Sequence, residues 1–185
     1  MEIYVIRHTH VAVAPGVCYG QSDVDVSATF KEEVSQLKDK LPDHFDRIYS
    51  SDLSRCSKLA EELAYECEII KDSRLRELNF GVWEQNRWDD VEVDSIKRWS
   101  ESFDVTAPPN GETYSDLVAR VYSWYNEVKS DSDSERILVV THAGVIRALW
   151  AILLEIPLLN SFKIPVDFGE VLILNSKFDT IIRKA

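Results

Sequence analysis

The sequence predicts an α/β fold: a three-layer sandwich in which helices cover both faces of a mostly parallel central sheet. Short apolar, β-branched runs bounded by polar residues alternate along the chain with longer stretches of helical periodicity. Strands that alternate with helices need crossover connections, which place helices on both faces of a parallel sheet. The last two apolar runs are close together and indicate a hairpin, so one edge strand is expected to be antiparallel.

Each element is expected from its own residue pattern. Strands are expected over Ile3–Ile6, Arg47–Tyr49, Glu68–Ile70, Ile137–Val140, Val171–Leu174 and Thr180–Ile182. Helices are expected over Ala28–Leu41, Asp52–Tyr65, Thr113–Lys129 and Ala143–Leu154. The final hairpin would turn around Asn175–Asp179, and the polar run Ser130–Glu135 is expected to be a solvated turn.

The length and composition predict one domain over residues 1–185. A chain of 185 residues with 45% apolar content can bury one good core. Residues 83–112 break the rhythm of the elements, because they hold three tryptophans, many acids and a Pro-Pro-Asn-Gly loop. This segment could be a lid insertion. Its tryptophans would either pack the insertion down or stack on an aromatic group of a substrate.

The charge and the cysteines limit the partners and the compartment. A formal net charge of -11 and a pI near 4.8 would repel nucleic acid and an anionic membrane surface. No apolar run approaches membrane-spanning length, and the N-terminus lacks the apolar region of a signal peptide. Three cysteines without a paired spacing suit reduced thiols. We therefore expect a cytoplasmic protein that binds neither nucleic acid nor a membrane.

Three polar clusters follow expected strands directly. Arg7-His8-Thr9 follows the first strand, Arg55 lies in the first turn of the helix after the second, and His142 follows the fourth. In a parallel sheet the carboxyl ends of the strands meet at one edge, where ligands usually bind. Arginines beside a helix start suit phosphate oxygens. The clusters therefore predict an anion site at this edge.

A fourth cluster adds a carboxyl group. Glu77 follows the third strand among the apolar neighbours Leu75, Leu78 and Phe80. Burial there would favour its protonated form, which suits a general acid.

Simpler interpretations exist for each residue alone. A single histidine after a strand is more often a hydrogen-bonding residue than a catalyst, and a single arginine or glutamate is usually solvated. His8, His142, Glu77 and Asp52 could also form a zinc site. The adjacent arginines argue against a metal, because they would repel a dication but neutralise a phosphoryl group.

Together the four clusters resemble the motifs of the histidine phosphatase superfamily, in the family's order. Ile6–His8 is similar to its opening Arg-His motif, and Ser50–Arg55 resembles its Ser-Ser-x-Leu-x-Arg motif. Arg76–Gly81 resembles its acid-residue segment, and Val140–Arg147 resembles the segment of its second histidine.

The resemblance implies a mechanism without a metal or organic cofactor. His8 would attack phosphorus and become a phosphohistidine that water hydrolyses. Glu77 would protonate the leaving alcohol, while Arg7, Arg55 and His142 would hold the phosphoryl oxygens. The expected partner is a small phosphorylated metabolite.

The chain also departs from the family's pattern. Thr9 and His10 replace a usual glycine and acidic residue, and Ala14 stands where many members place an asparagine that touches phosphate. The segment Gly16–Asp23 resembles that of α-ribazole phosphatases of cobalamin synthesis. Thr9 and Gln21 are accordingly expected to contact the substrate.

The sequence is compatible with three functions. The resemblance favours hydrolysis of a small phosphomonoester, with α-ribazole 5′-phosphate as one candidate. A broad-specificity phosphatase of sugar phosphates or nucleotides would use the same site. A non-catalytic phosphoanion-binding module would keep the fold without turnover.

Overall fold

The centre of the protein is a six-stranded sheet with the order β3-β2-β4-β1-β5-β6. The computed structural model describes residues 1–130, 134–175 and 180–184, with 180–184 as backbone alone. The strands are β1 (Glu2–Arg7), β2 (Arg47–Ser50), β3 (Ile69–Lys71), β4 (Arg136–Thr141), β5 (Val171–Asn175) and β6 (Thr180–Lys184).

Four neighbouring strands of this sheet are parallel. β1 and β2 both pair with β4 in parallel, and β3 pairs with β2 in parallel. β5 runs antiparallel to β1, and β6 runs antiparallel to β5. The predicted mostly parallel sheet with an antiparallel edge is therefore confirmed, and the antiparallel pairing there involves both β5 and β6. The turn expected between the last two strands falls largely on residues 176–179, outside the described residues.

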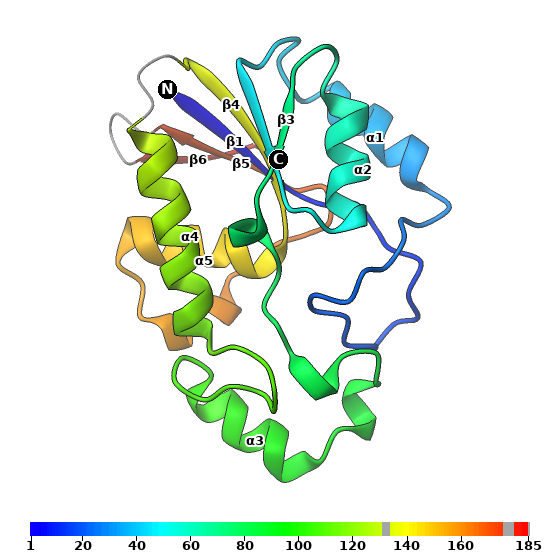
Figure 1. Ribbon diagram of the computed structural model, residues 1–185, viewed down its shortest axis with the longest axis vertical. Coiled ribbons are helices and arrows are strands. Elements are labelled where there is room, and N and C mark those ends of the chain that lie inside the picture. Colours follow the sequence, from blue (N-terminus) through cyan, green and yellow to red (C-terminus); the bar gives the residue numbers. More distant parts are fainter. Residues whose placement is uncertain (131–133, 176–179, 185) are drawn as a thin grey trace.

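Helices cover both faces of the sheet (Figure 1). One face carries α1 (Phe30–Lys38) and α2 (Ser54–Leu63), and the other carries α4 (Tyr114–Lys129) and α5 (Ala143–Leu154). This is the three-layer sandwich that the sequence predicts.

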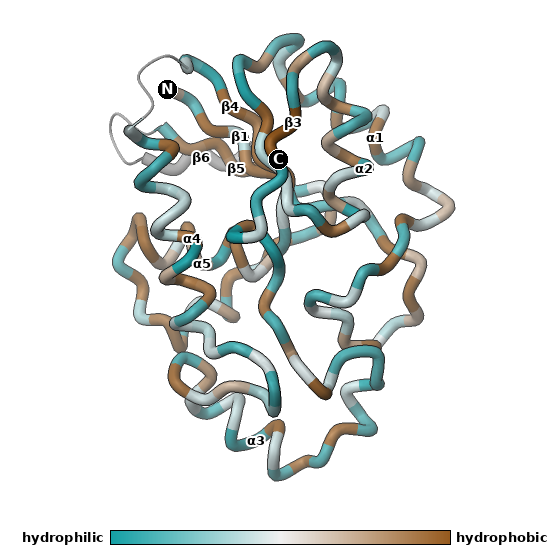
Figure 2. The backbone as a smooth tube through the Cα atoms, viewed as in Figure 1, coloured by the Kyte–Doolittle hydropathy of each residue, from teal (hydrophilic) through white to brown (hydrophobic). Residues whose placement is uncertain are grey.

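The alternating side chains of the strands build two cores. Along β1, Ile3 and Val5 point into the core under α4 and α5, whereas Tyr4 and Ile6 point into the core under α1 and α2. Hydrophobic residues accordingly gather along the strands in Figure 2. Full burial of an aliphatic side chain stabilises the fold by about 1.5–3 kcal/mol, so a sheet buried on both faces holds its strand ends in fixed positions.

The helix boundaries follow local signals. Helix α4 begins after Thr113, whose hydroxyl and main chain form a capping box with Asp116. Helix α5 has the bounds expected from the sequence. Helices α1 and α2 are shorter than expected at both ends. The polar run expected to be a turn after α4 lies partly outside the described residues, at 131–133.

The segment over residues 83–112 contains a helix that the sequence analysis does not predict. Helix α3 (Val93–Ser102) lies far from the sheet at the lower end of Figure 1. No residue of α3 is fully buried, and the helix is attached chiefly through Trp99, whose ring packs on Trp83 and Phe80 at centroid distances of 5.8 and 5.7 Å. Trp88 stacks on Trp99. The tryptophans thus pack on one another, while the role of the segment as a lid stays a prediction.

Short 3₁₀ turns complete the chain. They are η1 (Ser73–Leu75), η2 (Gly81–Trp83), η3 (Trp88–Asp90) and η4 (Leu158–Lys163). Within the described residues, none of the helices has the length and apolar character needed to cross a bilayer. The cytoplasmic compartment stays a prediction.

Candidate functional site

The strand register brings the predicted clusters together. Arg7 at the end of β1 is aligned with Thr141 at the end of β4, and Ser50 of β2 is aligned with Val140. The backbone amide of His8 donates to the Thr141 carbonyl at 2.9 Å, so the residues that follow the strands also lie side by side. Positions 8, 51 and 142 therefore meet at the carboxyl edge of the parallel strands, as the sequence predicts.

His8 is a buried, neutral imidazole with one nitrogen committed to the backbone. His8 is only 1% exposed, and its Nδ1 lies 2.8 Å from the Thr9 carbonyl oxygen. A carbonyl only accepts, so Nδ1 carries the proton and Nε2 keeps its lone pair. Burial, followed by the positive charge of Arg55, holds the pKa of His8 well below its usual range.

His142 faces His8 across the site. The two ring centroids are 5.1 Å apart with an interplanar angle of 65°. His142 Nε2 shares a hydrogen bond of 2.9 Å with the Ser51 hydroxyl, and Cys56 Sγ lies 3.4 Å from the same nitrogen. Burial, and then Arg55, also hold the pKa of His142 well below its usual range. The site thus contains two uncharged imidazoles at neutral pH.

These two histidines predict a pH-dependent stability. We expect the free energy of unfolding to decrease as the pH falls below about 6.5, the ordinary histidine pKa. In that range the unfolded chain binds protons that the folded chain does not, so each histidine costs up to about 1.4 kcal/mol per pH unit. Above this range both states are neutral, and the dependence disappears.

Urea unfolding from about pH 5 to about pH 8 checks this expectation, because most carboxylates stay ionised above pH 5. The His142→Gln variant should show a shallower decrease than the unmodified protein. His44→Gln is the matched control, because the His44 side chain is 77% exposed. Equal slopes in all three proteins would contradict the assignment of two buried neutral imidazoles.

Two arginines flank the imidazoles. Arg55, in the first turn of α2, is fully buried and donates to the carbonyl oxygens of Ser22 and Gly20 at 3.0 and 2.7 Å. Arg7 donates to the Val166 carbonyl at 2.6 Å, and its guanidinium lies 3.7 Å from the centre of the Phe168 ring. Both guanidinium groups are therefore held in place by backbone oxygens and an aromatic ring, and in the described part of the chain neither forms an ion pair with a carboxylate.

Polar atoms without partners gather at this site. In the described part of the chain, Arg7 Nε, Arg55 Nε and the Thr9 hydroxyl are buried and have no hydrogen-bond partner. Leaving a buried donor unpaired costs roughly 1–3 kcal/mol. An oxyanion next to His8 would supply acceptors for the two guanidinium donors, as the predicted phosphate site requires.

Glu77 reaches the site from the loop after η1. Its carboxylate accepts hydrogen bonds from the Leu78 amide at 2.8 Å and from the Gly144 amide at 3.1 Å. The residue is partly exposed, not enclosed by its apolar neighbours as the sequence analysis expects. A Cβ atom at position 144 would lie 2.1 Å from Glu77 Oε1, so only glycine lets the carboxylate approach the start of α5 so closely.

Two side chains whose role here the sequence does not predict, Arg120 and Gln21, hold the backbone of Glu77. Arg120 of α4 donates to the carbonyl oxygens of Arg76 and Glu77, at 2.7 and 3.0 Å, and pairs with Glu112. Gln21, predicted to touch substrate, donates its side-chain amide to the Glu77 carbonyl at 2.9 Å. These side chains fix the loop that presents Glu77, and Gln21 remains only a proposed substrate contact.

Asp52, the fourth member of the alternative zinc set, is engaged elsewhere. Its carboxylate forms a two-pronged ion pair with the guanidinium of Arg76, with one hydrogen bond of 2.7 Å. This ion pair lowers the pKa of Asp52. The carboxylate is therefore a partner of Arg76, not of the two histidines.

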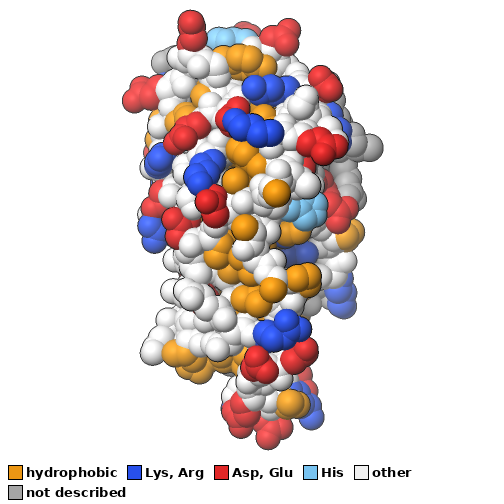
Figure 3. All heavy atoms as spheres, turned by 90° about the vertical axis from the view of Figure 1, so that its right-hand side faces the viewer, with side chains coloured by type: hydrophobic (Ala, Val, Ile, Leu, Met, Phe, Trp, Pro, Cys, Tyr) orange, Lys and Arg blue, Asp and Glu red, His pale blue; other side chains and the backbone are white. Residues whose placement is uncertain are grey.

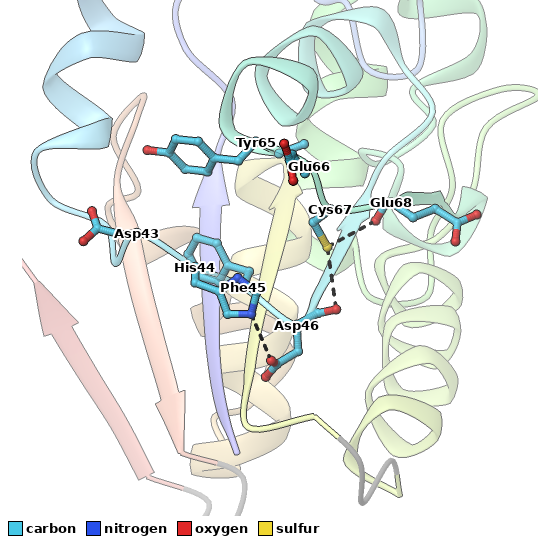
Figure 4. Close-up of a pocket in the computed structure, with 9 residues that line it drawn as sticks. Asp43, His44, Phe45, Asp46, Tyr65, Glu66, Cys67 and Glu68 are labelled. Atoms are coloured by element: carbon cyan, nitrogen blue, oxygen red, sulfur yellow. Dashed lines mark hydrogen bonds and ion pairs between the residues drawn. The ribbon is translucent and has the colours of Figure 1, made fainter.

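A separate groove of about 620 Å³ lies at the opposite edge of the sheet (Figure 4). It is lined by residues 43–46, which precede β2, and residues 64–68, which precede β3. Four of its lining side chains are carboxylates, namely Asp43, Asp46, Glu66 and Glu68. Such a groove repels phosphate, which leaves the cluster around His8 as the candidate anion site.

Acidic and basic side chains are interspersed on one face of the molecule. The face shown in Figure 3 carries both signs in close alternation, with no large basic area. A phosphate group would thus find its positive charge in Arg7 and Arg55, against the net charge of -11.

Fold and site together define an α/β protein with paired neutral histidines and two guanidinium groups at the carboxyl edge of its parallel strands. The model of the histidine phosphatase superfamily (branch 1) matches residues 3–181. The chain belongs to this superfamily of phosphatases and mutase-like enzymes, which act on small phosphorylated substrates.

Curated relatives carry different activities in their names. The chain is 28% identical to phosphoserine phosphatase 1 of Hydrogenobacter thermophilus, over 90% of this chain and 82% of the relative. It is 29% identical to phosphoglycerate mutase-like protein 4 of Arabidopsis thaliana, over 80% of this chain and 69% of that protein.

Solved structures share the fold over nearly the whole chain. The α-ribazole phosphatase of Shigella flexneri superposes with a TM-score of 0.89 at 23% identity and covers 100% of this chain and 95% of its own. The mycobacterial glucosyl-3-phosphoglycerate phosphatase in complex with VO3 superposes with a TM-score of 0.78 at 26% identity, over 94% and 92% of the two chains.

Proposed function

We propose that this protein is a phosphomonoesterase that passes the phosphoryl group of a small metabolite through Nε2 of His8 to water. The observation that carries the proposal is a buried imidazole whose Nε2 lone pair is free, beside two guanidinium groups with unpaired Nε donors. A neutral imidazole is a nucleophile, and the guanidinium donors match phosphoryl oxygens.

The proposed reaction has two steps. In the first, Nε2 of His8 forms a bond to phosphorus while the bond from phosphorus to the ester oxygen breaks, and Glu77 gives its proton to the leaving alcohol. In the second, Glu77 takes a proton from water as the water oxygen bonds to phosphorus, and His8 leaves. Inorganic phosphate is the product, and no metal or organic cofactor takes part.

Arg7, Arg55 and His142 would stabilise the charge on the phosphoryl oxygens in both steps. Preorganised donors of this kind are each worth roughly 10²–10³-fold in rate. The backbone contacts of Arg7 and Arg55 support this role, because fixed donors need no rearrangement during the reaction. Thr9, whose buried hydroxyl is unpaired, is a further proposed contact.

We propose α-ribazole 5′-phosphate as the first substrate to test. The segment Gly16–Asp23 resembles that of α-ribazole phosphatases, and the fold is that of the Shigella flexneri enzyme. Phosphoserine and 3-phosphoglycerate follow as candidates, because relatives at 28–29% identity are named for a phosphoserine phosphatase and a phosphoglycerate mutase-like protein.

Phosphate release in the presence of EDTA tests the proposal. The substrates are p-nitrophenyl phosphate, α-ribazole 5′-phosphate, phosphoserine, 3-phosphoglycerate and mononucleotides. Strong preference for one ester assigns the substrate class, and comparable rates on several esters assign a broad-specificity phosphatase. No release from any ester by the folded protein, together with binding of inorganic phosphate, would favour the non-catalytic binding module.

The Glu77→Gln variant tests the general acid. We expect the rate on an alkyl phosphate to fall by roughly 10²–10⁴-fold, because an alkoxide needs a proton as it leaves. The rate on p-nitrophenyl phosphate should fall much less in the first step, since p-nitrophenolate leaves without one. Burst kinetics separate the two steps, and Glu101→Gln, an exposed change on α3, is the control. An equal loss on both esters in the first step would remove Glu77 from this role.

A further inference from the structure

The segment over residues 166–170, just before β5, contacts Arg7 at both its backbone and its side chain. The Arg7 amide donates to the Glu170 carbonyl at 3.1 Å, and the Gly169 amide donates to the Arg7 carbonyl at 3.2 Å. The Val166 carbonyl accepts from the Arg7 guanidinium at 2.6 Å. None of the motifs in the sequence analysis lies in this segment, although it holds the end of β1.

Phe168 of this segment places its aromatic ring against the same guanidinium. The guanidinium carbon of Arg7 lies over the ring, 3.7 Å from its centre. The ring centroid of Phe168 is also 5.6 Å from that of His8. A cation within about 6 Å of an aromatic face is attracted by the negative charge of that face. The ring therefore holds the positive charge of Arg7 beside the His8 imidazole.

A tight turn fixes the backbone that carries the ring. The Asp167 amide donates to the Glu170 carboxylate at 2.9 Å, and the Glu170 amide donates to the Asp167 carbonyl at 3.2 Å. Gly169 has a φ of +64°, a left-handed conformation that glycine adopts without the strain of a Cβ atom. The Phe168 side chain thus starts from a defined position.

The contact of Phe168 with Arg7 separates a positioning role from substrate binding. The guanidinium occupies one face of the ring, so that face cannot stack on a substrate. Arg7 Nε is buried and has no partner in the described part of the chain, so it is the donor left for an anion. A flexible arginine loses rotamer freedom when it binds an anion, whereas a guanidinium already fixed on a ring loses little.

We infer that Phe168 is a positioning residue, which holds the Arg7 guanidinium in the orientation that leaves Nε for a phosphoryl oxygen. The inference rests on the proposed function only in so far as the cluster around His8 binds a phosphoryl group. Phe168 acts through Arg7 and makes no hydrogen bond to the anion itself.

The Phe168→Leu variant keeps an apolar side chain and removes the aromatic face. We expect inorganic phosphate to bind roughly 3- to 10-fold more weakly by calorimetry, the cost of immobilising one flexible side chain on binding. Phe168→Tyr keeps the face and should bind phosphate as the unmodified protein does. Tyr65→Leu is the matched control, because the Tyr65 ring lies 5.8 Å from the Lys38 ammonium and lines the groove at the opposite edge.

A double-mutant cycle shows whether the effect passes through Arg7. In an Arg7→Ala background, Phe168→Leu should change the phosphate affinity by less than about twofold, because the group that it positions is gone. An equal loss with and without Arg7 would overturn the inference. So would a Phe168→Leu affinity within about twofold of that of the unmodified protein, or a loss in Phe168→Tyr as large as in Phe168→Leu.

Nuclear magnetic resonance of the unmodified protein decides the question if Phe168→Leu does not fold in urea-unfolding controls. Protons that lie over an aromatic ring resonate upfield. In phosphate-free buffer the Arg7 Nε proton, identified by its loss in Arg7→Lys, should therefore resonate upfield of that of Arg87, whose side chain is 52% exposed. The absence of this shift would contradict the stacked guanidinium.

The outcomes also separate this inference from the proposed function. An unmodified protein that binds phosphate but hydrolyses no ester would contradict the proposed function alone, because calorimetry still measures the effect of Phe168. An unmodified protein that binds neither phosphate nor vanadate would overturn both.

Discussion

The His8→Ala variant is expected to lose at least roughly 10⁴-fold in kcat on every phosphomonoester that the unmodified protein hydrolyses. Deleting a nucleophile removes the covalent pathway itself, and losses of that order are usual for such changes. The arginines remain in place in this variant, since their backbone contacts do not involve His8. Phosphate binding should therefore survive while turnover disappears.

A second measurement follows the covalent intermediate directly. Quenching the unmodified protein in alkali during turnover should trap phosphate on the protein, because a phosphohistidine is stable in base and labile in acid. The His8→Ala protein should carry none. His10→Ala is the control, because the His10 side chain is 60% exposed and pairs with Glu33. Turnover by His8→Ala at a rate near that of the control would exclude His8 as the nucleophile.

The strand ends explain why so much of the site is predictable from the sequence. Three polar pairs each follow an apolar run, namely Arg7-His8, Ser50-Ser51 and Thr141-His142. Neighbouring parallel strands run in the same direction, so their carboxyl ends lie at the same edge of the sheet. The pattern that predicts the sheet therefore also predicts which polar residues meet. Only the alternation of strands and helices is needed for this step, and the family resemblance adds the chemical roles.

The residues that support the site are not predictable in the same way. Arg120 binds carbonyl oxygens on a loop more than 40 positions earlier in the chain. A side chain that binds a distant carbonyl leaves no periodic pattern in the sequence. Helix α3 is not predicted, because its apolar residues Val93, Ile96 and Trp99 form only a short stripe within a segment whose tryptophans and acids break the rhythm of the other elements.

The Arg55→Ala variant is expected to show the second-largest effect, through two separate losses. The first loss is that of a guanidinium group that would stabilise the transition state. Losing such a donor raises the activation free energy by about 3–4 kcal/mol, or lowers kcat/KM roughly 10²–10³-fold. The second is the support of the loop over residues 19–22, because the carbonyl oxygens of Gly20 and Ser22 lose their charged donor. We therefore expect kcat/KM to fall by at least 10³-fold, with phosphate affinity reduced as well.

Arg55 also has a measurable effect on the two histidines that a purely structural role would not produce. After burial, its positive charge is the strongest influence that lowers the pKa of both His8 and His142. Removing it raises both values, so His8 takes up a proton at a higher pH. The acidic limb of kcat/KM should then move to higher pH in Arg55→Ala. The substrate's own ionisation is the same in both proteins and cancels in the comparison.

Arg87→Ala is the matched control for charge, because the Arg87 side chain is 52% exposed. It should leave both kcat/KM and its pH profile unchanged. Arg55→Lys restores a positive charge but cannot reproduce the two-pronged contact with Gly20 and Ser22, so it should return the acidic limb toward its original position and recover only part of the rate. If Arg55→Ala lowered the rate without moving the acidic limb, Arg55 would act only on the loop or the phosphate. The neutral state of His8 would then depend on burial and on the other nearby cation, Arg7.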